Sequence, residues 1–122
     1  GYYISCSADT IVAQPNTITG SIGVFGLLFN AQNMLKNKLG ITFDSYNTGN
    51  YSDMGTVTRP LTEAERLILQ NSVEHVYATF TKRVSDGRSI PIAQVDSIGQ
   101  GRVWSGIDAK RIGLFRWCNH KS

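Results

Sequence analysis

The sequence has no long apolar run. Apolar residues make up 41% of its 122 residues, yet no run approaches the roughly 20 that a helix needs to cross a bilayer. No secretory signal sequence is visible within these residues. Charged residues are also few, at 17%. This composition excludes a disordered chain and indicates a globular fold with one modest core.

Cysteine and histidine are scarce, with two residues of each type. Cys6 and Cys118 are too few for a disulfide framework and do not have the spacing of a metal site, so no metal and no cofactor are expected. Cys6 lies among small and apolar residues, which predicts a buried side chain. A nucleophilic Cys6 is the competing interpretation, but nothing marks His75 or His120 as its base.

Charge of one sign is not concentrated anywhere in the chain. The formal net charge is +3, and basic runs are short, as at Lys82-Arg83. Scattered basic residues are typical of a solvated surface, so we do not expect binding to nucleic acid. Internal repeats and low-complexity segments are absent as well.

The most informative stretch covers residues 8–26. It predicts a short buried strand over Thr10–Ala13, a turn at Pro15-Asn16, and a second apolar segment interrupted by three glycines. Glycines at this spacing allow another backbone or a ligand to approach closely. The segment is therefore a candidate for the wall of a site.

Three motifs follow one another along the chain. They are Thr19-Gly20-Ser21-Ile22-Gly23, Arg59-Pro60-Leu61-Thr62-Glu63-Ala64-Glu65 and Gly101-Arg102-Val103-Trp104-Ser105-Gly106-Ile107-Asp108-Ala109-Lys110. Together with the opening Gly1-Tyr2-Tyr3-Ile4-Ser5, they resemble the signal peptide peptidase A (protease IV) family of serine proteases. One such motif would be a weak signal, but three in this order and spacing are specific. The resemblance covers roughly residues 1–114 and is closest to the C-terminal half of the long, tandem form.

The resemblance implies an α/β fold of the layered clp-protease/crotonase-like type, built from ββα units and present here as a partial domain. Strands that alternate with helices agree with this fold class and favour a partly parallel sheet. We expect residues 1–114 to be a fragment of the C-terminal peptidase domain. Residues 115–122 are expected to be a divergent or artificially added tail.

Local signals predict the elements of the first half. Residues 2–7 have the pattern of a helix end, and residues 27–39 have apolar spacing typical of a helix, which Gly40 is expected to end. Residues 41–43 predict a short strand. Residues 44–58 are rich in turn formers and predict a loop.

The longest predicted helix begins with a capping box, Thr62-x-x-Glu65. In this motif the threonine hydroxyl accepts from an unpaired backbone N–H, while the glutamate reaches back to the cap. Apolar residues at helical spacing extend the prediction to about Val84, with an end near Asp86-Gly87. Both capping residues are interpreted as structural.

The last third of the chain predicts shorter elements. Pro91 favours a short helix that continues through Ile98. Residues 101–104 predict a short strand or edge segment. Either Ser105 or Asp108 is expected to cap the helical turn that follows.

The resembled family cleaves peptides with a serine nucleophile and a lysine base, whose pKa must be lowered by burial. Backbone amides stabilise the oxyanion. The family's nucleophile opens the motif Ser-Gly-Gly-Tyr-Tyr/Trp, which Gly1-Tyr2-Tyr3 matches from the second glycine onward. The expected nucleophile therefore lies two residues before Gly1.

The lysine base of short family members lies in a segment similar to Gly-Lys-Tyr-Lys-Asp. This chain has Gly49-Asn50-Tyr51-Ser52-Asp53 there, so Ser52 occupies the position of the lysine, and no lysine lies between Lys38 and Lys82. The departure resembles the tandem form, in which the N-terminal half supplies the lysine. These residues alone are then expected to be inactive. The alternative is a degenerate domain that never had a base.

Ser21 is the candidate site residue within the chain. In the family, the serine of Thr-Gly-Ser-Ile-Gly resembles a helper that hydrogen-bonds the lysine amine and orients it. The competing interpretation is a small residue in a tight glycine turn, with its hydroxyl satisfied by the backbone. No substrate-binding residue is assigned.

Other polar and aromatic residues are interpreted as structural. Tyr2 and Tyr3 are expected in the core rather than in contact with substrate. Trp104 is expected to pack between layers. Asp53 is interpreted as a turn residue and His75 as a surface residue.

The function implied by the resemblance is that of a membrane-associated endopeptidase that degrades cleaved signal peptides. Its implied location is the extracytoplasmic side of the bacterial inner membrane, reached through an anchor outside this chain. The implied partners are peptide substrates, the N-terminal half of the same protein and further copies of it. Residues 27–29 are three successive apolar residues, of which at least one is expected to face a neighbouring domain.

Two other functions are compatible with the fold. The first is a crotonase-like acyl-CoA enzyme, which would need oxyanion amides and a CoA site. The second is a non-catalytic scaffold domain that assembles into rings. The Ser-Ile-Gly and Gly-Arg-Val-Trp segments favour the protease over both.

Overall fold

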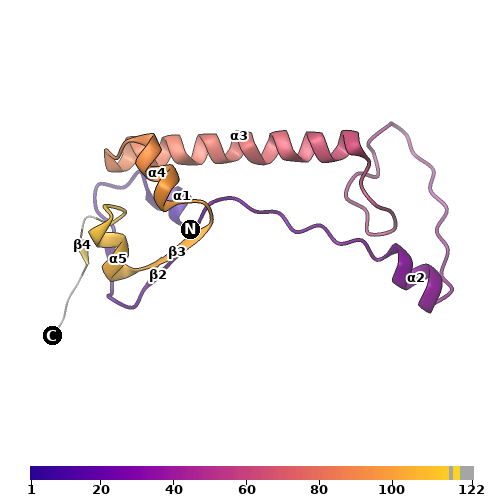
Figure 1. Cartoon of the computed structure of the whole chain (residues 1–122), viewed down its shortest axis with the longest axis horizontal. Helices are drawn as coiled ribbons and strands as arrows, with labels where there is room; N and C mark the ends of the chain where they lie inside the picture. The colour runs from indigo at the N-terminus through magenta and orange to yellow at the C-terminus, as the bar shows by residue number, and fades with distance from the viewer. Residues whose placement is uncertain (116, 119–122) are drawn as a thin grey trace. The chain divides into compact units, whose positions relative to one another are not determined.

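The computed structural model describes residues 1–115 and the backbone of residues 117–118. Within the tail expected at 115–122, Arg116 and residues 119–122 lie outside the described residues. The chain divides into two compact units (Figure 1), one of Gly1–Phe25 with Glu74–Ser122 and the other of Gly26–Val73. Among the described helices, none combines the length and the apolar character that crossing a membrane requires.

The first unit combines helices and short strands. Its elements are α1 (Tyr2–Ser5), β1 (Val12–Ala13), β2 (Ile18–Ile22), the end of α3 (Glu63–Arg88), α4 (Ile92–Ile98), β3 (Arg102–Ser105), α5 (Gly106–Arg111) and β4 (Trp117–Cys118). β2 pairs with β3 in antiparallel orientation, and β1 pairs with β4 in parallel. The predicted mixture of helices and strands is confirmed, with one parallel and one antiparallel pair among the described residues.

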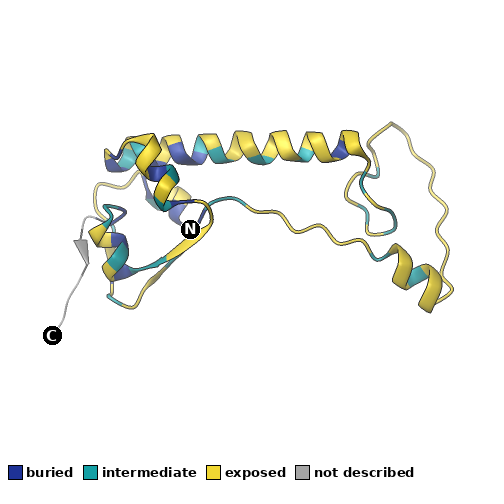
Figure 2. Cartoon of the chain, in the orientation of Figure 1, coloured by how far each residue is buried: buried dark blue, intermediate teal, exposed yellow. Residues whose placement is uncertain are grey.

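The hydrophobic core belongs to the first unit. Figure 2 shows buried residues on α1, on the C-terminal turns of α3, and on α4 and α5. The buried apolar residues are Tyr2, Cys6, Ala13, Ile22, Phe80, Val84, Ile90, Val95, Ala109, Leu114 and Phe115. Full burial of one large aliphatic side chain stabilises a fold by about 1.5–3 kcal/mol, so this cluster holds the helices against the strands. Phe115, the first residue of the expected tail, is part of the core.

Several predicted core residues are buried as expected. Tyr2 is buried, and its hydroxyl donates a 2.7 Å hydrogen bond to the carbonyl of Leu114. Cys6 is fully buried, and its thiol donates to the carbonyl of Tyr3. Trp104 is half-buried against the core, with its indole Nε1 donating to the carbonyl of Ile98 at 2.9 Å.

The predicted elements of the C-terminal third are confirmed with small shifts. α3 continues to Arg88 rather than ending near Gly87, and α4 begins after Pro91, which is its N-cap residue. Of the two capping candidates for α5, Ser105 is the cap, since its hydroxyl accepts from the backbone N–H of Asp108.

The second unit contains α2 (Gln32–Lys38), a long loop and the start of α3. The predicted helix over 27–39 was too long at its start. Ala31 donates its backbone N–H to the carbonyl of Val57, and Asn30 accepts from Gln32, so the chain up to Ala31 stays non-helical. The end of this helix is confirmed, because Gly40 follows it with a φ of +66°.

The strand predicted at residues 41–43 is wrong. Ile41 donates its backbone N–H to the carbonyl of Leu35, so the chain folds back onto the end of α2 instead of pairing with another strand. The loop predicted over 44–58 is confirmed as a series of turns. β-branched and aromatic residues favour a strand only where a pairing partner exists.

Glu65 is the buried residue of the second unit, and its carboxylate forms an ion pair with Arg59. The Arg59 guanidinium donates to both carboxylate oxygens of Glu65, at 2.8 and 2.6 Å, and to both of Asp53, at 2.7 Å each. The predicted capping box also forms, because Thr62 N–H donates to Glu65 Oε2 and Glu65 N–H donates to Thr62 Oγ1. Asp53 lies in a turn as predicted, and its link to Arg59 was not anticipated.

Candidate functional site

Ser21 lies on β2, opposite Val103 of β3. Its hydroxyl donates a 3.0 Å hydrogen bond to the carbonyl oxygen of Gly101. In the same region, the Gly101 N–H donates to the carbonyl of Ile22 at 2.9 Å. The first and third sequence motifs are therefore joined through main-chain and side-chain bonds at this serine.

The glycines next to Ser21 permit this close pairing. A Cβ atom added to Gly23 would lie 2.5 Å from the backbone nitrogen of Gly101, a distance that real side chains do not reach. Gly20 and Gly101 have φ values of +75° and +82°, in the left-handed region that favours glycine. The close approach of another backbone that the glycine spacing predicted therefore occurs at Gly23, whereas Gly20 and Gly26 have open space at their Cβ positions.

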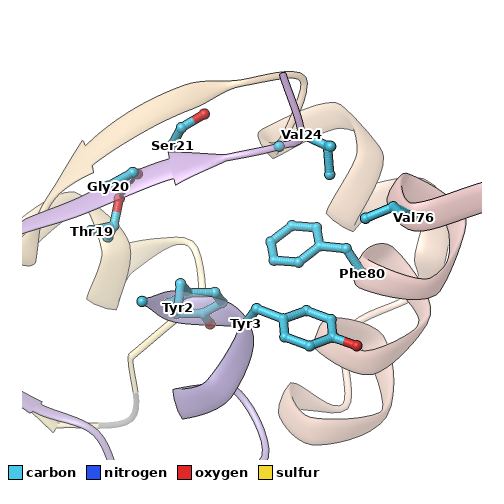
Figure 3. Close-up of a pocket in the computed structure, with 10 residues that line it drawn as sticks. Tyr2, Tyr3, Thr19, Gly20, Ser21, Val24, Val76 and Phe80 are labelled. Carbon is cyan, nitrogen blue, oxygen red and sulfur yellow. Dashed lines mark hydrogen bonds between the residues drawn. The ribbon is translucent and has the colours of Figure 1, made fainter. Parts of the chain in front are cut away.

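A cavity of about 360 Å³ lies between the start of α1, the glycine segment around β2 and the second half of α3. Figure 3 shows the side chains of Val24, Val76 and Phe80 on one side of this space. Strand β2 with Gly20 and Ser21, called the glycine strand below, lies along another side. Its lining residues are Gly1, Tyr2, Tyr3, Thr19, Gly20, Ser21, Gly23, Val24, Val76 and Phe80. Apolar side chains and backbone edges therefore make up most of its wall.

Tyr3 belongs to this wall and not to the core, which corrects the expectation for this residue. Its side chain is 39% exposed and stacks on Phe80 with ring centroids 6.0 Å apart. Arg83 covers the same ring, with its Cζ atom 5.1 Å from the centroid. Tyr3 is exposed because successive residues of a helix point in different directions, and Tyr2 takes the inward one.

The hydroxyl of Ser21 is oriented by the carbonyl of Gly101, the residue that precedes β3. In Figure 3 it points away from the rings of Tyr2 and Phe80, so Ser21 lines the cavity mainly with its backbone. A hydroxyl that donates its proton to a carbonyl retains lone pairs that accept hydrogen bonds. The position is compatible with both interpretations of Ser21, since the backbone satisfies its proton while its oxygen remains an acceptor.

The other described residues that the sequence analysis considered for catalysis or metal binding do not line this cavity. Ser52 is exposed, and its hydroxyl donates to the carbonyl of Gly49. His75 is exposed on α3, as expected for a surface residue. Across residues 1–115, no three side chains of the types that ligate metals come together. Cys118 and His120 have side chains outside the described residues.

Two properties of residues near the cavity were not predicted from the sequence. They are the pKa of Tyr2 and the hydrogen-bond partners of Arg88. Burial raises the pKa of Tyr2 to about 12, an effect that the nearby Arg88 guanidinium partly opposes. Arg88 itself is only 5% exposed, and its Nη2 donates to the carbonyls of Ser5 and Ala8. No sequence pattern marks an arginine at a helix end as buried, so this residue was missed.

Comparison with known proteins gives a consistent result. The sequence profile of peptidase family S49 matches residues 1–119. Protease 4 of Salmonella typhi is 40% identical over 114 residues, which cover 93% of this chain and 18% of that protein. The chloroplastic serine protease SPPA of Arabidopsis thaliana is 36% identical over 115 residues, covering 93% of this chain and 17% of that protein.

A third relative is a putative signal peptide peptidase SppA of Enterococcus faecium. It is 36% identical over 114 residues, which cover 93% of this chain and 33% of that protein. The chain thus spans a third or less of the length of these relatives. The match to the family profile extends through both compact units and includes the segment of Gly20 and Ser21, the capping box and the β3–α5 segment.

Proposed function

Because this chain belongs to peptidase family S49, we propose that it is part of a serine endopeptidase of the Ser-Lys type. The nucleophile is expected two residues before Gly1, at the start of the helix that continues as α1. The lysine base is expected in the N-terminal half of the same protein, because Ser52 stands where short family members carry it. Residues 1–114 then form part of the C-terminal peptidase domain, with the layered clp-protease/crotonase-like fold.

We propose that Ser21 orients the lysine. Its proton is donated to the carbonyl of Gly101, which fixes the hydroxyl and leaves the oxygen free to accept from an amine. A lysine that acts as base must be neutral, and a neutral amine has N–H groups to donate. Ser21 therefore contributes geometry to the reaction and not a proton.

The cavity beside Ser21 is proposed to hold an apolar side chain of an extended peptide. Its walls combine Val24, Val76 and Phe80 with the backbone of Gly20 and Ser21. Apolar walls favour the leucine-rich sequences of cleaved signal peptides, and an exposed backbone edge pairs with an extended chain. The membrane-anchored location at the bacterial cell envelope is part of the same proposal.

The second unit offers a surface to the rest of the protein. Leu27, Leu28 and Phe29 are 72%, 55% and 72% exposed, which supports the prediction that at least one of them faces a neighbouring domain. An apolar cavity of about 370 Å³ adjoins Leu28, Leu61 and Leu69. Apolar surface of this kind favours association. We propose that the N-terminal half of the protein covers it within a homo-oligomer.

The observation that carries the proposal is the family match over residues 1–119 together with a glycine strand that presents Ser21 beside an apolar cavity. The test is cleavage of a fluorogenic leucine-rich peptide by the full-length protein, with labelling by a fluorophosphonate probe. Cleavage that the probe abolishes supports the protease. Turnover of an acyl-CoA thioester without probe labelling favours the crotonase-like enzyme, and intact assembly with neither activity favours the scaffold.

A further inference from the structure

Arg88 is a buried cation without a carboxylate partner among the described residues. Only 5% of the residue is exposed, yet its buried Nε and Nη1 atoms have no hydrogen-bond acceptor in the part of the chain that the structure describes. Its Nη2 atom makes two bonds, to the carbonyl of Ser5 at 3.1 Å and to that of Ala8 at 2.9 Å. Both acceptors lie at the C-terminal end of α1 or just beyond it.

The energetics argue against a role in stability. The bonds from Nη2 favour the folded state, whereas a buried charge and two buried N–H groups without acceptors oppose it. Replacement of a buried ion pair by apolar side chains of similar volume is often neutral, and the same opposition between desolvation and hydrogen bonding applies to this unpaired cation. Ser5 and Ala8 are not buried, so water can reach their carbonyls if the arginine is removed.

Gly87, the residue before Arg88, brings α3 into direct contact with the chain after α1. A Cβ atom at Gly87 would lie within 3 Å of the carbonyl carbon of Cys6 and closer still to its oxygen. The last turn of α3 therefore touches the backbone of Cys6 and holds the carbonyls on either side of it through Arg88. The end of α1 is fixed by both contacts at once.

From these contacts we infer that Arg88 is a positioning residue, which holds α1 in the orientation that the nucleophile requires. The inference rests on the proposed function, in which the nucleophile lies at the start of the same helix. α1 begins at the cavity wall with Tyr2 and Tyr3, and its C-terminal end lies at the carbonyls to which Arg88 donates hydrogen bonds. A rotation of the helix about this contact would move its first residues relative to Gly20 and Ser21.

The test uses the full-length protein with Arg88→Met, Arg88→Lys and the control Lys82→Met, an exposed lysine on the same helix. We expect Arg88→Met to lower kcat about 10- to 100-fold, because small displacements of reacting groups have effects of that size. KM should stay within about twofold. The melting temperature should stay within about 3 °C of the wild type, since the opposing terms nearly cancel. Arg88→Lys should restore much of kcat, because an ammonium group donates to the same carbonyls.

Hydrogen exchange provides a readout that does not depend on activity. The amides of Cys6 and Ala8 are bonded to the carbonyls of Tyr2 and Ser5, and their exchange should accelerate about tenfold in Arg88→Met. Unchanged kcat and unchanged exchange would overturn the inference, as would a variant that fails to fold. If the wild type cleaves no peptide, the proposed function fails, and the exchange experiment still decides whether Arg88 fixes α1.

Discussion

The Ser21 hydroxyl and the Gly101 carbonyl, 80 positions apart in the sequence, are joined by a 3.0 Å hydrogen bond. The bond fixes the rotation of the hydroxyl and directs its lone pairs away from Gly101. A serine that served only to fill a glycine turn would make the same bond. The two interpretations of Ser21 therefore differ in their consequences for turnover and not in the geometry of this bond.

Ser21→Ala in the full-length enzyme should lower kcat much more than it lowers stability. Loss of one hydrogen bond that orients a neutral lysine costs about 1–3 kcal/mol in the transition state, or about 5- to 150-fold in rate. Steady-state kinetics and thermal unfolding measure both effects. Ser97→Ala is the matched control, because Ser97 is exposed and also donates to a backbone carbonyl, that of Gln94. An unchanged rate would assign Ser21 a structural role only.

Gly23→Ala should destabilise the fold by about 1–3 kcal/mol, because the new methyl group must push β3 away from β2. The added carbon would meet both the nitrogen and the Cα of Gly101, at 2.5 and 2.7 Å. Chemical denaturation measures the loss. Gly49→Ala is the control, since Gly49 has open space around its Cβ position and no positive φ. Equal stability of the two variants would contradict the close approach of β2 and β3.

Val76→Phe should fill part of the cavity and change substrate preference. Val76 lines the cavity and is 46% exposed, so a larger ring fits there without entering the core. We expect KM for peptides with a large apolar side chain to rise about tenfold, with less effect on peptides that carry alanine there. Val12→Phe on β1 is the control, because Val12 is exposed and does not line the cavity. The same change in both variants would remove the cavity from the substrate site.

The stability of the second unit should depend on pH through Arg59. Hydrogen bonds from Arg59 lower the pKa of Asp53 and of Glu65 to about 2 each, with the Thr62 N–H adding to the effect on Glu65. Carboxyl groups of an unfolded chain titrate near pH 4. As the pH falls below about 5, the unfolded state therefore binds more protons than the folded state does. Stability is then fully present above about pH 5 and is lost as the pH falls toward about 2.

Arg59→Met should flatten this dependence, as measured by melting temperature between pH 2 and pH 7. Arg66→Met is the control, because the ion pair of Arg66 with Glu63 is 4.0 Å long and exposed on both sides. A slope that persists in Arg59→Met would show that other carboxylates cause it.

Local rules explain which elements the sequence predicted correctly. The capping box at Thr62 and Glu65, the stop at Gly40 and the cap at Ser105 depend on residues within one helical turn. Such signals operate before any tertiary contact forms, so the printed sequence contains all the information they need.

The elements that were predicted wrongly, the start of the helix near residue 31 and the strand at residues 41–43, depend on tertiary contacts that local sequence rules do not describe. Ile41 has a strand-like sequence around it but no strand to pair with, and Ala31 is held by Val57, far along the loop. The same limit explains why the cluster of Arg59 and the burial of Arg88 were missed. Each requires knowing which segment folds back on which, and a single arginine in a sequence does not say what its guanidinium will meet.

At the candidate site, the motif predicted the close approach of another backbone at the glycine segment, the role of Ser21 stays a prediction, and the cavity was not predictable. Its far wall comes from Val76 and Phe80, which helical spacing alone assigns to a uniform apolar face of α3. In the structure Phe80 is buried and Val76 is exposed. The difference arises because, within the first unit, Tyr77, Phe80 and Val84 of α3 belong to the core or pack against it and Val76 does not, which periodicity cannot reveal.

Because Cys6 is enclosed, the accessibility of its thiol reports on opening of the first unit. Its thiol is fully buried and bonded to the Tyr3 carbonyl, so an alkylating reagent reaches it only when α1 separates from α3. The rate of alkylation at the Cys6 peptide therefore measures how often that separation occurs. Modification of Cys6 will consequently report on opening of the first unit, and inhibition that arises from Cys6 will follow this opening instead of marking a sulfur nucleophile.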